Sequence, residues 1–102
     1  MRKYEIMVIL KPLLPDDIRR STMEKVEKTV KEFKGEVKKS EVWGKRHLAY
    51  EVGGHSDGYY VLWGVELDPK KVDALNKELS LVSDVLRHIV LQVEQFDLKE
   101  IK

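Results

Sequence analysis

The sequence predicts one α+β domain in which a four-stranded antiparallel sheet carries two helices on one face. Its 102 residues are enough for a single domain. Apolar residues recur every second position in four stretches, which predicts strands, and at helical spacing in two stretches, which predicts helices. Along the chain these stretches follow the order β-α-β-β-α-β. Each helical stretch has a single apolar stripe, so both helices can cover the same face of the sheet.

The first strand is expected at residues 3–10, where apolar side chains alternate. The two prolines of "KPLLPDD" end it, because proline cannot donate to a strand ladder. A helix is expected next, starting at Asp16 or Asp17, whose carboxylates can accept hydrogen bonds from its free amides. It should run to about Lys34 and stop at Gly35. The apolar stripe of this helix is Met23, Val26, Val30 and Phe33.

A long second strand is expected at residues 36–52, kinked or bulged at Gly44. The stretch "GGHSDG" at 53–58 consists of glycine and turn-forming residues and predicts a hairpin connection. The third strand should then occupy residues 59–67. Its core-facing side chains are Val61, Trp63, Val65 and Leu67.

A second helix begins after Asp68, a capping residue that precedes a proline suited to the first helical turn. The last strand is expected at residues 85–93. The complete order is the ferredoxin-like arrangement. It defines one domain over residues 1–94 and leaves residues 95–102 as a loosely held tail. The second apolar stripe is Val72, Leu75, Leu79 and Val82.

Composition excludes several classes of protein. There is no cysteine, so disulfides and thiolate chemistry are excluded. The formal net charge is +1, so global charge does not predict a polyanionic partner. The longest wholly apolar run, residues 6–10, is far too short to span a membrane. A soluble, cytoplasmic protein is expected.

No enzyme, metal site or cofactor is expected. Three histidines, His47, His55 and His88, have no carboxylate at ligand spacing. His55 is interpreted as a solvated turn residue, and His88 as a satisfied histidine at the sheet surface or a phosphate contact. An acyl phosphatase, which shares the fold class, would need an anion-binding loop with an arginine after the first strand. Here that loop is "KPLLPDD", which is acidic and rigid.

Local positive charge is the first feature with a functional interpretation. Between residues 38 and 47 there are four Lys or Arg against one acid. Lys38 and Lys39 are better explained as charges that protect a strand edge from aggregation. At Lys45 and Arg46 a phosphate contact is a comparable explanation. The candidate RNA-binding residues are Arg2, Lys45, Arg46, His47 and Arg87.

The second feature is the face of the sheet that the helices leave uncovered. Such a face normally alternates to polar side chains, but here three strands place apolar residues on it. An apolar patch with a charged rim marks a partner site. Stacked bases would need more aromatic residues than Tyr60 alone, so a protein partner fits better. The candidate partner-binding residues are Met7, Ile9, Tyr60, Leu62, Ile89 and Leu91.

Three stretches, "MRKYEIMVILKP", "GKRHLAYEV" and "GYYVLWGVEL", resemble the bacterial small-subunit ribosomal protein six family. The likeness runs over about residues 1–94. Its most specific part is residues 44–50, which fit the family signature of glycine, any residue, a basic residue, a polar residue and Leu-Ala-Tyr. Val52 and Gly53 depart from the isoleucine and the basic or polar residue that the pattern prefers, and no phosphate contact is carried over to Gly53.

The resemblance implies a structural component of the ribosome without a catalytic role. The family pairs with small-subunit ribosomal protein eighteen, and the pair binds the central domain of the small-subunit ribosomal RNA. The basic cluster would then contact phosphates, while the alternation of Leu48, Tyr50 and Val52 anchors its strand in the sheet. The residues alone leave open a protein-interaction or metabolite-sensing module of the same fold, acting as a homodimer that buries its open face.

Overall fold

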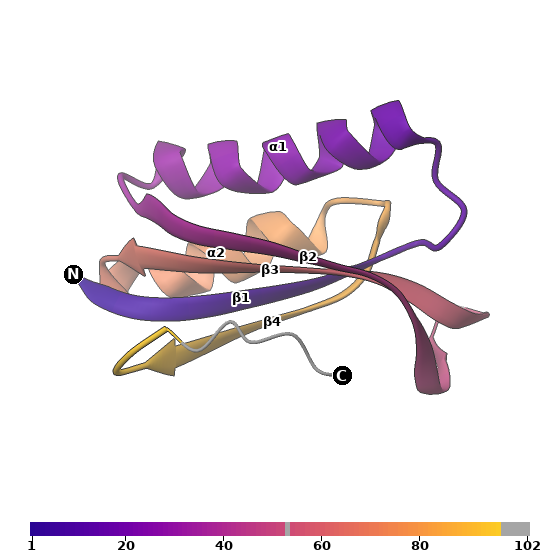
Figure 1. Cartoon of the computed structure of the whole chain (residues 1–102). Helices are drawn as coiled ribbons and strands as arrows, with labels where there is room; N and C mark the ends of the chain where they lie inside the picture. Colours follow the sequence, from indigo (N-terminus) through magenta and orange to yellow (C-terminus); the bar gives the residue numbers. More distant parts are fainter. Residues whose placement is uncertain (53, 97–102) are drawn as a thin grey trace.

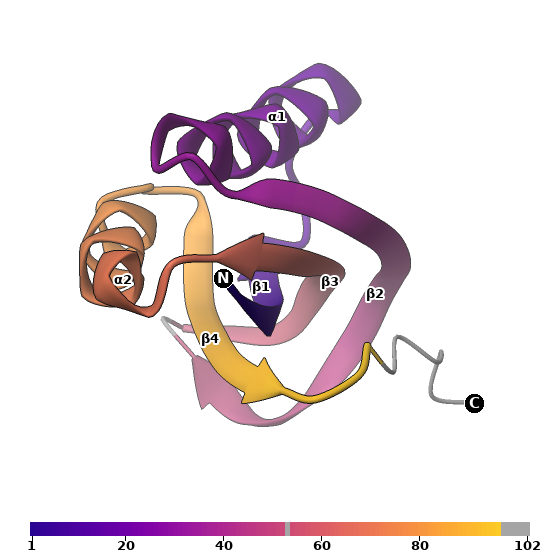
Figure 2. The ribbon, with the colours of Figure 1, turned by 90° about the vertical axis from the view of Figure 1, so that its left-hand side faces the viewer.

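The predicted order of elements is confirmed by a computed structural model, which describes residues 1–52 and 54–96. The sheet has the strand order β2-β3-β1-β4, and all neighbouring strands are antiparallel. Both helices lie on the same side of this sheet, and its other face is free of helices (Figure 1, Figure 2). The elements are β1 (Arg2–Leu10), α1 (Asp16–Glu32), β2 (Glu36–Val52), β3 (His55–Leu67), a 3-10 turn η1 (Pro69–Lys71), α2 (Val72–Ser80) and β4 (Val85–Val93).

The hydrophobic core lies between the sheet and the helices, where the alternation in the sequence places it. The central strands β1 and β3 contribute alternate side chains, and each helix contributes the middle of its apolar stripe. The indole Nε1 of Trp63 donates a hydrogen bond of 3.0 Å to Glu27 Oε2, so the largest core side chain has its polar atom satisfied. The buried core residues are Tyr4, Ile6, Val8, Leu10, Val26, Val30, Val61, Trp63, Val65, Leu67, Leu75 and Leu79.

The ends of α1 differ from the expected ones. Its N-cap residue is Pro15, and neither aspartate makes a capping hydrogen bond. Asp16 instead forms an ion pair of 2.9 Å with Arg19, one turn along the helix. The two acids in the first turn still favour the helix start, because they lie at the positive end of its dipole. Asp68 is a capping residue as expected, but it caps the 3-10 turn that precedes the second helix: its Oδ1 accepts from the backbone N–H of Lys70 at 2.9 Å, while the N-cap residue of α2 itself is Lys71.

At the C-terminal end of α1 the left-handed residue is Lys34, with φ of 63°, and not the glycine. Gly35 is required for a different reason. A Cβ on Gly35 would lie 2.8 Å from the carbonyl oxygen of Glu66 and 2.9 Å from the Leu67 side chain. The glycine therefore lets the chain enter β2 directly against β3.

The hairpin of β2 and β3 is longer than the sequence suggested. Residues 55–58, expected as part of the turn, belong to β3, where Gly58 pairs with Arg46 and Asp57 with His47. The predicted kink at Gly44 is confirmed: its φ is 81°, and the pairing register shifts there. Beyond this point the ribbon has only two strands, and it curves toward the side opposite the helices (Figure 1).

The chain after β4 turns back over the helix-free face. The ring of Phe96 lies on Gly64 of β3, where a Cβ would be only 2.8 Å from the nearest ring atom. The ammonium of Lys3 is 5.8 Å from the centroid of the same ring. The tail for which loose attachment is expected covers residues 95–102, and residues 97–102 of it lie outside the described residues.

Candidate nucleic-acid and protein interfaces

The antiparallel register brings most of the candidate basic residues to one end of the sheet. At this end β1 finishes with Leu10, which pairs with Tyr59, and Tyr59 pairs with Lys45 of β2. Arg87 of β4 pairs with Ile9, one residue before the end of β1. This end, which we call the basic end, holds Lys45, Arg46, His47 and Arg87.

Arg2 is separated from the other candidates. It pairs with Leu67 at the start of β1, a full strand length from the basic end. Nine residues of antiparallel strand span about 30 Å at 3.4 Å per residue. Arg2 can therefore share a ligand with the basic end only if that ligand runs the length of the sheet.

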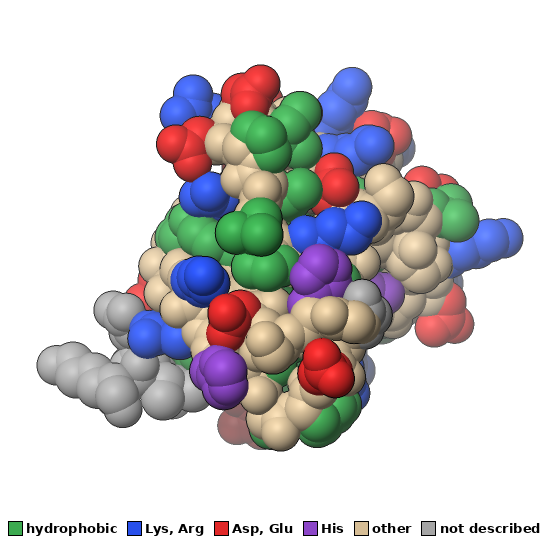
Figure 3. Space-filling view, turned by 90° about the vertical axis from the view of Figure 1, so that its right-hand side faces the viewer, with side chains coloured by type: hydrophobic (Ala, Val, Ile, Leu, Met, Phe, Trp, Pro, Cys, Tyr) green, Lys and Arg blue, Asp and Glu red, His purple; other side chains and the backbone are tan. Residues whose placement is uncertain are grey.

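An acidic residue that sequence reasoning assigned to a turn lies within the basic end. Asp57 Oδ1 is 2.8 Å from His47 Nδ1, and Asp57 Oδ2 is 3.8 Å from Lys45 Nζ. Both basic side chains remain largely exposed, so they are accessible to an anion that competes with this carboxylate. Figure 3 shows this end of the molecule, where Lys, Arg and His side chains are interspersed with acids and with hydrophobic side chains.

His88 belongs to the helix-covered side. It pairs with the core residue Val8, and its Nε2 is 3.2 Å from Asn76 Oδ1 on α2. Partial burial lowers the pKa of His88 below its ordinary value of 6.5. Of the two interpretations of His88, the geometry favours a histidine whose hydrogen bond is made within the protein over a phosphate contact.

The six candidate partner-binding residues, all on the helix-free face, differ in accessibility. Ile9 and Leu62 are buried, with exposed fractions of 5% and 8%, whereas Leu91 is 57% exposed. The other three, Met7, Tyr60 and Ile89, are half-buried. Four of the six, Met7, Tyr60, Ile89 and Leu91, are therefore accessible for direct contact with a partner.

Trp43 extends this apolar face, although the sequence did not point to it. Its ring stacks on Tyr60 with centroids 6.3 Å apart and an interplanar angle of 11°. Strict alternation along β2 could not assign Trp43 to a face, because the register shifts between Val42 and Gly44. The bulge at this position determines that the Trp43 side chain lies on the same face as Tyr60.

The alternation of Leu48, Tyr50 and Val52 is expected to anchor β2 in the sheet, and the structure shows that these residues do so outside the main core. The curved hairpin places these residues over the helix-free face and away from the core beneath the helices. Leu48 is buried there, while Tyr50 is 64% exposed and its hydroxyl accepts a 2.6 Å hydrogen bond from Arg87 Nη1. They surround a hollow of about 200 Å³ lined by Met7, Ile9, Leu48, Ala49, Tyr50, Val52, Tyr60, Arg87 and Ile89.

Comparison with known proteins identifies the family. The family model described as Ribosomal protein S6 matches residues 3–92. The chain belongs to the ribosomal protein S6 family.

Its relatives match over nearly their whole length. The small ribosomal subunit protein bS6 of Mycobacterium tuberculosis is 41% identical over 95 residues, 93% of this chain and 99% of that protein. The bS6 protein of Thermobifida fusca is 39% identical over 94 residues, 92% of this chain and 98% of that protein. The crystal structure of 30S ribosomal protein S6 from Thermotoga maritima superposes with a TM-score of 0.85 at 28% identity, covering 90% of this chain and 87% of that one. The family resemblance inferred from the signature is thereby confirmed.

Membership in this family makes the chain a protein of the small ribosomal subunit, located on the cytoplasmic ribosome. A place in the small subunit implies ribosomal RNA and other ribosomal proteins as partners. None of the described helices is long and apolar enough to cross a membrane.

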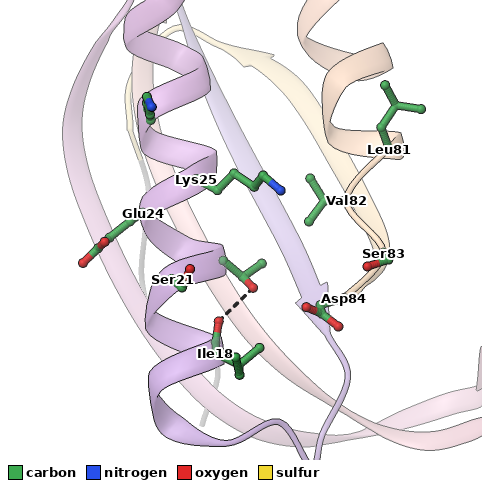
Figure 4. A pocket seen from close by; sticks show the side chains of 10 residues that line it. Ile18, Ser21, Glu24, Lys25, Leu81, Val82, Ser83 and Asp84 are labelled. Carbon is green, nitrogen blue, oxygen red and sulfur yellow. Dashed lines mark hydrogen bonds between the residues drawn. The ribbon is translucent and has the colours of Figure 1, made fainter.

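A larger groove of about 470 Å³ lies on the helix side, between α1 and the loop that joins α2 to β4. Figure 4 shows Ile18 and Lys25 of α1 facing Val82 and Asp84 across it. Within residues 1–52 and 54–96 no three His, Asp or Glu side chains converge to hold a metal ion, here or elsewhere. The groove lies on the helix side of the sheet, at the end where β1 finishes and β4 begins.

Proposed function

We propose that this member of the ribosomal protein S6 family binds the central domain of the small-subunit ribosomal RNA as a pair with small-subunit ribosomal protein eighteen. It acts as a structural component and catalyses no reaction. The observation that carries the proposal is the juxtaposition of two surfaces. The helix-free face of the sheet carries an apolar patch, and the basic end lies at the edge of that patch.

The apolar patch supports a protein partner. Leu91 is the most exposed of its apolar side chains, and the half-buried Ile89 and Tyr60 continue the patch across the sheet. Monomeric proteins rarely leave a connected apolar surface in water without using it. Trp43 and Tyr60 are stacked on each other, so they are not splayed out to receive separate bases as in RNA-recognition sheets.

The basic end supports an RNA contact that depends on the partner. Lys45 and Arg87 offer exposed positive charge, but Asp57 offsets part of it and the whole chain carries only +1. Counterion release from a few phosphates is therefore too small for tight binding by the chain alone. A bound protein partner would align the basic end with the RNA backbone and contribute contacts of its own. Arg2, at the other end, would contact a separate phosphate group.

The test is a binding titration of a central-domain RNA fragment with the chain alone and with recombinant ribosomal protein eighteen present. Binding should be weak and salt-sensitive alone, and should tighten by at least tenfold with the partner. Equal affinity in both titrations would refute the joint binding.

The partner surface is tested separately by Leu91→Asp. This substitution should abolish capture of ribosomal protein eighteen and leave the thermal midpoint nearly unchanged, because Leu91 is exposed. Leu62→Asp is the matched contrast: Leu62 is buried, so a charge there should unfold the protein. A Leu91→Asp variant that still captures the partner would refute the assignment of this face. A stable homodimer in light scattering would favour the alternative, a self-associating module.

A further inference from the structure

The hollow under the curved hairpin gives a role to the Leu-Ala-Tyr sequence at residues 48–50. Neither the core nor the RNA contact explains these residues. Leu48 is buried outside the main core, Tyr50 is mostly exposed, and Ala49 lines the hollow between them. The three residues form one wall of the hollow, and β1, β3 and β4 form the opposite wall.

The hollow is held open by two specific contacts. Gly58 has no side chain, so Ile9 and Leu48 approach its backbone directly, and a Cβ at this position would collide with Ile9. At the other side the Tyr50 hydroxyl accepts from Arg87 Nη1 at 2.6 Å, which joins the hairpin to β4. The contacts hold the hairpin above the sheet without letting it collapse onto the sheet. Ala49, whose side chain is a single methyl group, is an exposed residue that also lines the hollow.

The volume and lining of the hollow restrict what can fill it. Its volume is about 200 Å³, and Arg87 is the one charged residue among the aliphatic and aromatic residues that line it. Small-molecule sites usually measure roughly 300–1,000 Å³, whereas a cavity of about 150 Å³ can hold a benzene ring. The hollow therefore suits one large side chain better than a metabolite.

Charge favours an aromatic side chain among the large ones. Within the described part of the chain Arg87 has no acidic partner, so its guanidinium presents an uncompensated positive charge at the rim. Cations interact favourably with the face of an aromatic ring. The same face already has one such arrangement, because the ring of Phe96 lies on Gly64 with Lys3 above it.

We propose that this hollow receives one aromatic side chain of the protein partner, and that Ala49 is small in order to leave room for it. The inference rests on the proposed function, because the hollow is continuous with the apolar face assigned to ribosomal protein eighteen. Met7 and Ile89 belong both to that face and to the lining of the hollow. The partner's ring would rest on these side chains, with the Arg87 guanidinium against its face.

The first experiment fills the hollow from two walls. Ala49→Leu and Val52→Phe each add volume to the lining, and each should weaken binding of recombinant ribosomal protein eighteen by at least tenfold in calorimetry. Ala49→Ser, which is nearly the same size as alanine, is the matched control and should bind within twofold of the wild type. Thermal midpoints are measured for all variants, and two filling sites ensure that a folding defect in one does not decide the outcome.

The second experiment distinguishes an aromatic occupant from an aliphatic one. Methyl resonances of Ile89 and Met7 should move upfield when unlabelled partner is added to labelled chain, because an aromatic ring current shields protons above its face. Binding without an upfield shift would overturn the aromatic assignment. Ring-current shifts that persist in Ala49→Leu would place the ring outside the hollow and would also overturn it.

Failure of this inference can be told apart from failure of the proposed function. If both filled variants bind the partner like the wild type while Leu91→Asp does not, the hollow is unused and the partner surface stands. If Leu91→Asp also binds, the proposed function fails as well. If Ala49→Leu instead dissociates a homodimer, or changes the hydrogen exchange of residues 97–102 in the isolated chain, the occupant is a second copy or the chain's own end, and the inference is wrong.

Discussion

Replacing Lys45 with alanine tests the RNA contact most directly. Lys45 is an exposed cation at the basic end, and its only ion pair within the described residues is the long one of 3.8 Å to Asp57. Exposed pairs of this kind contribute less than about 1 kcal/mol to folding, so stability should barely change. The effect should appear in the salt dependence of RNA binding, because a variant with one phosphate contact fewer releases fewer counterions when it binds.

The magnitude follows from the number of cations at this end. Three permanently charged residues, Lys45, Arg46 and Arg87, would contribute roughly −2.4 to the slope of log affinity against log salt, at about 0.8 per contact. Through these contacts alone the wild type would lose about 30-fold in affinity between roughly 50 and 200 mM salt, and Lys45→Ala about 10-fold. Base changes in the RNA should alter both proteins equally, since phosphate contacts carry no sequence information.

The same strand offers a matched control. Lys38 is also exposed and also forms an ion pair, with 2.7 Å between its Nζ and Glu36 Oε2, but it lies toward the opposite end of β2. The hydrogen bond and charge of Glu36 raise the pKa of Lys38, so this side chain is charged in the assay. Titrations of a central-domain RNA fragment at four salt concentrations, with the protein partner present, should give Lys38→Ala the wild-type slope. Identical slopes for Lys45→Ala and the wild type would refute the phosphate contact.

Three further predictions concern the acid in the basic end, the core and the half-buried histidine. Asp57→Asn should strengthen RNA binding and steepen its salt dependence, because it removes the carboxylate beside Lys45 and His47; weaker binding would mean that Asp57 positions these side chains. Leu75→Ala should lower the free energy of unfolding by about 2–5 kcal/mol in urea titrations, since Leu75 is fully buried; a loss below about 1 kcal/mol would place it outside the core. His88 should make the free energy of unfolding depend on pH, because the pKa of His88 is lower in the folded chain than in the unfolded chain. The unfolded chain therefore binds the proton more readily. The contribution to stability is complete above the ordinary pKa of 6.5 and is lost as the pH falls through that value. Unfolding titrations between about pH 5 and 8 should show that this dependence is weaker in His88→Asn.

The sequence by itself determined the elements and the composition of the core. Apolar periods of two and of 3.6 depend only on near neighbours, and they placed β4 at the observed residues and assigned Val26, Val30, Leu75 and Leu79 to the interior. The capping role of Asp68 was equally local. The signature at residues 44–50 was sufficient to indicate the family, because it is a contiguous pattern that can be recognised without any knowledge of contacts.

Only the tertiary structure decided which way the side chains of the second strand face and which charges meet. The bulge at Gly44 and the two-stranded ribbon beyond it turn Leu48, Ala49 and Tyr50 over the helix-free face, and they bring Tyr50 to Arg87, 37 residues further along the chain. The same register joins Asp57 to Lys45 and separates Arg2 from the basic end. The physical reason is that a bulge reverses the alternation of faces, and pairing register depends on contacts between residues far apart in the sequence, which no local period encodes.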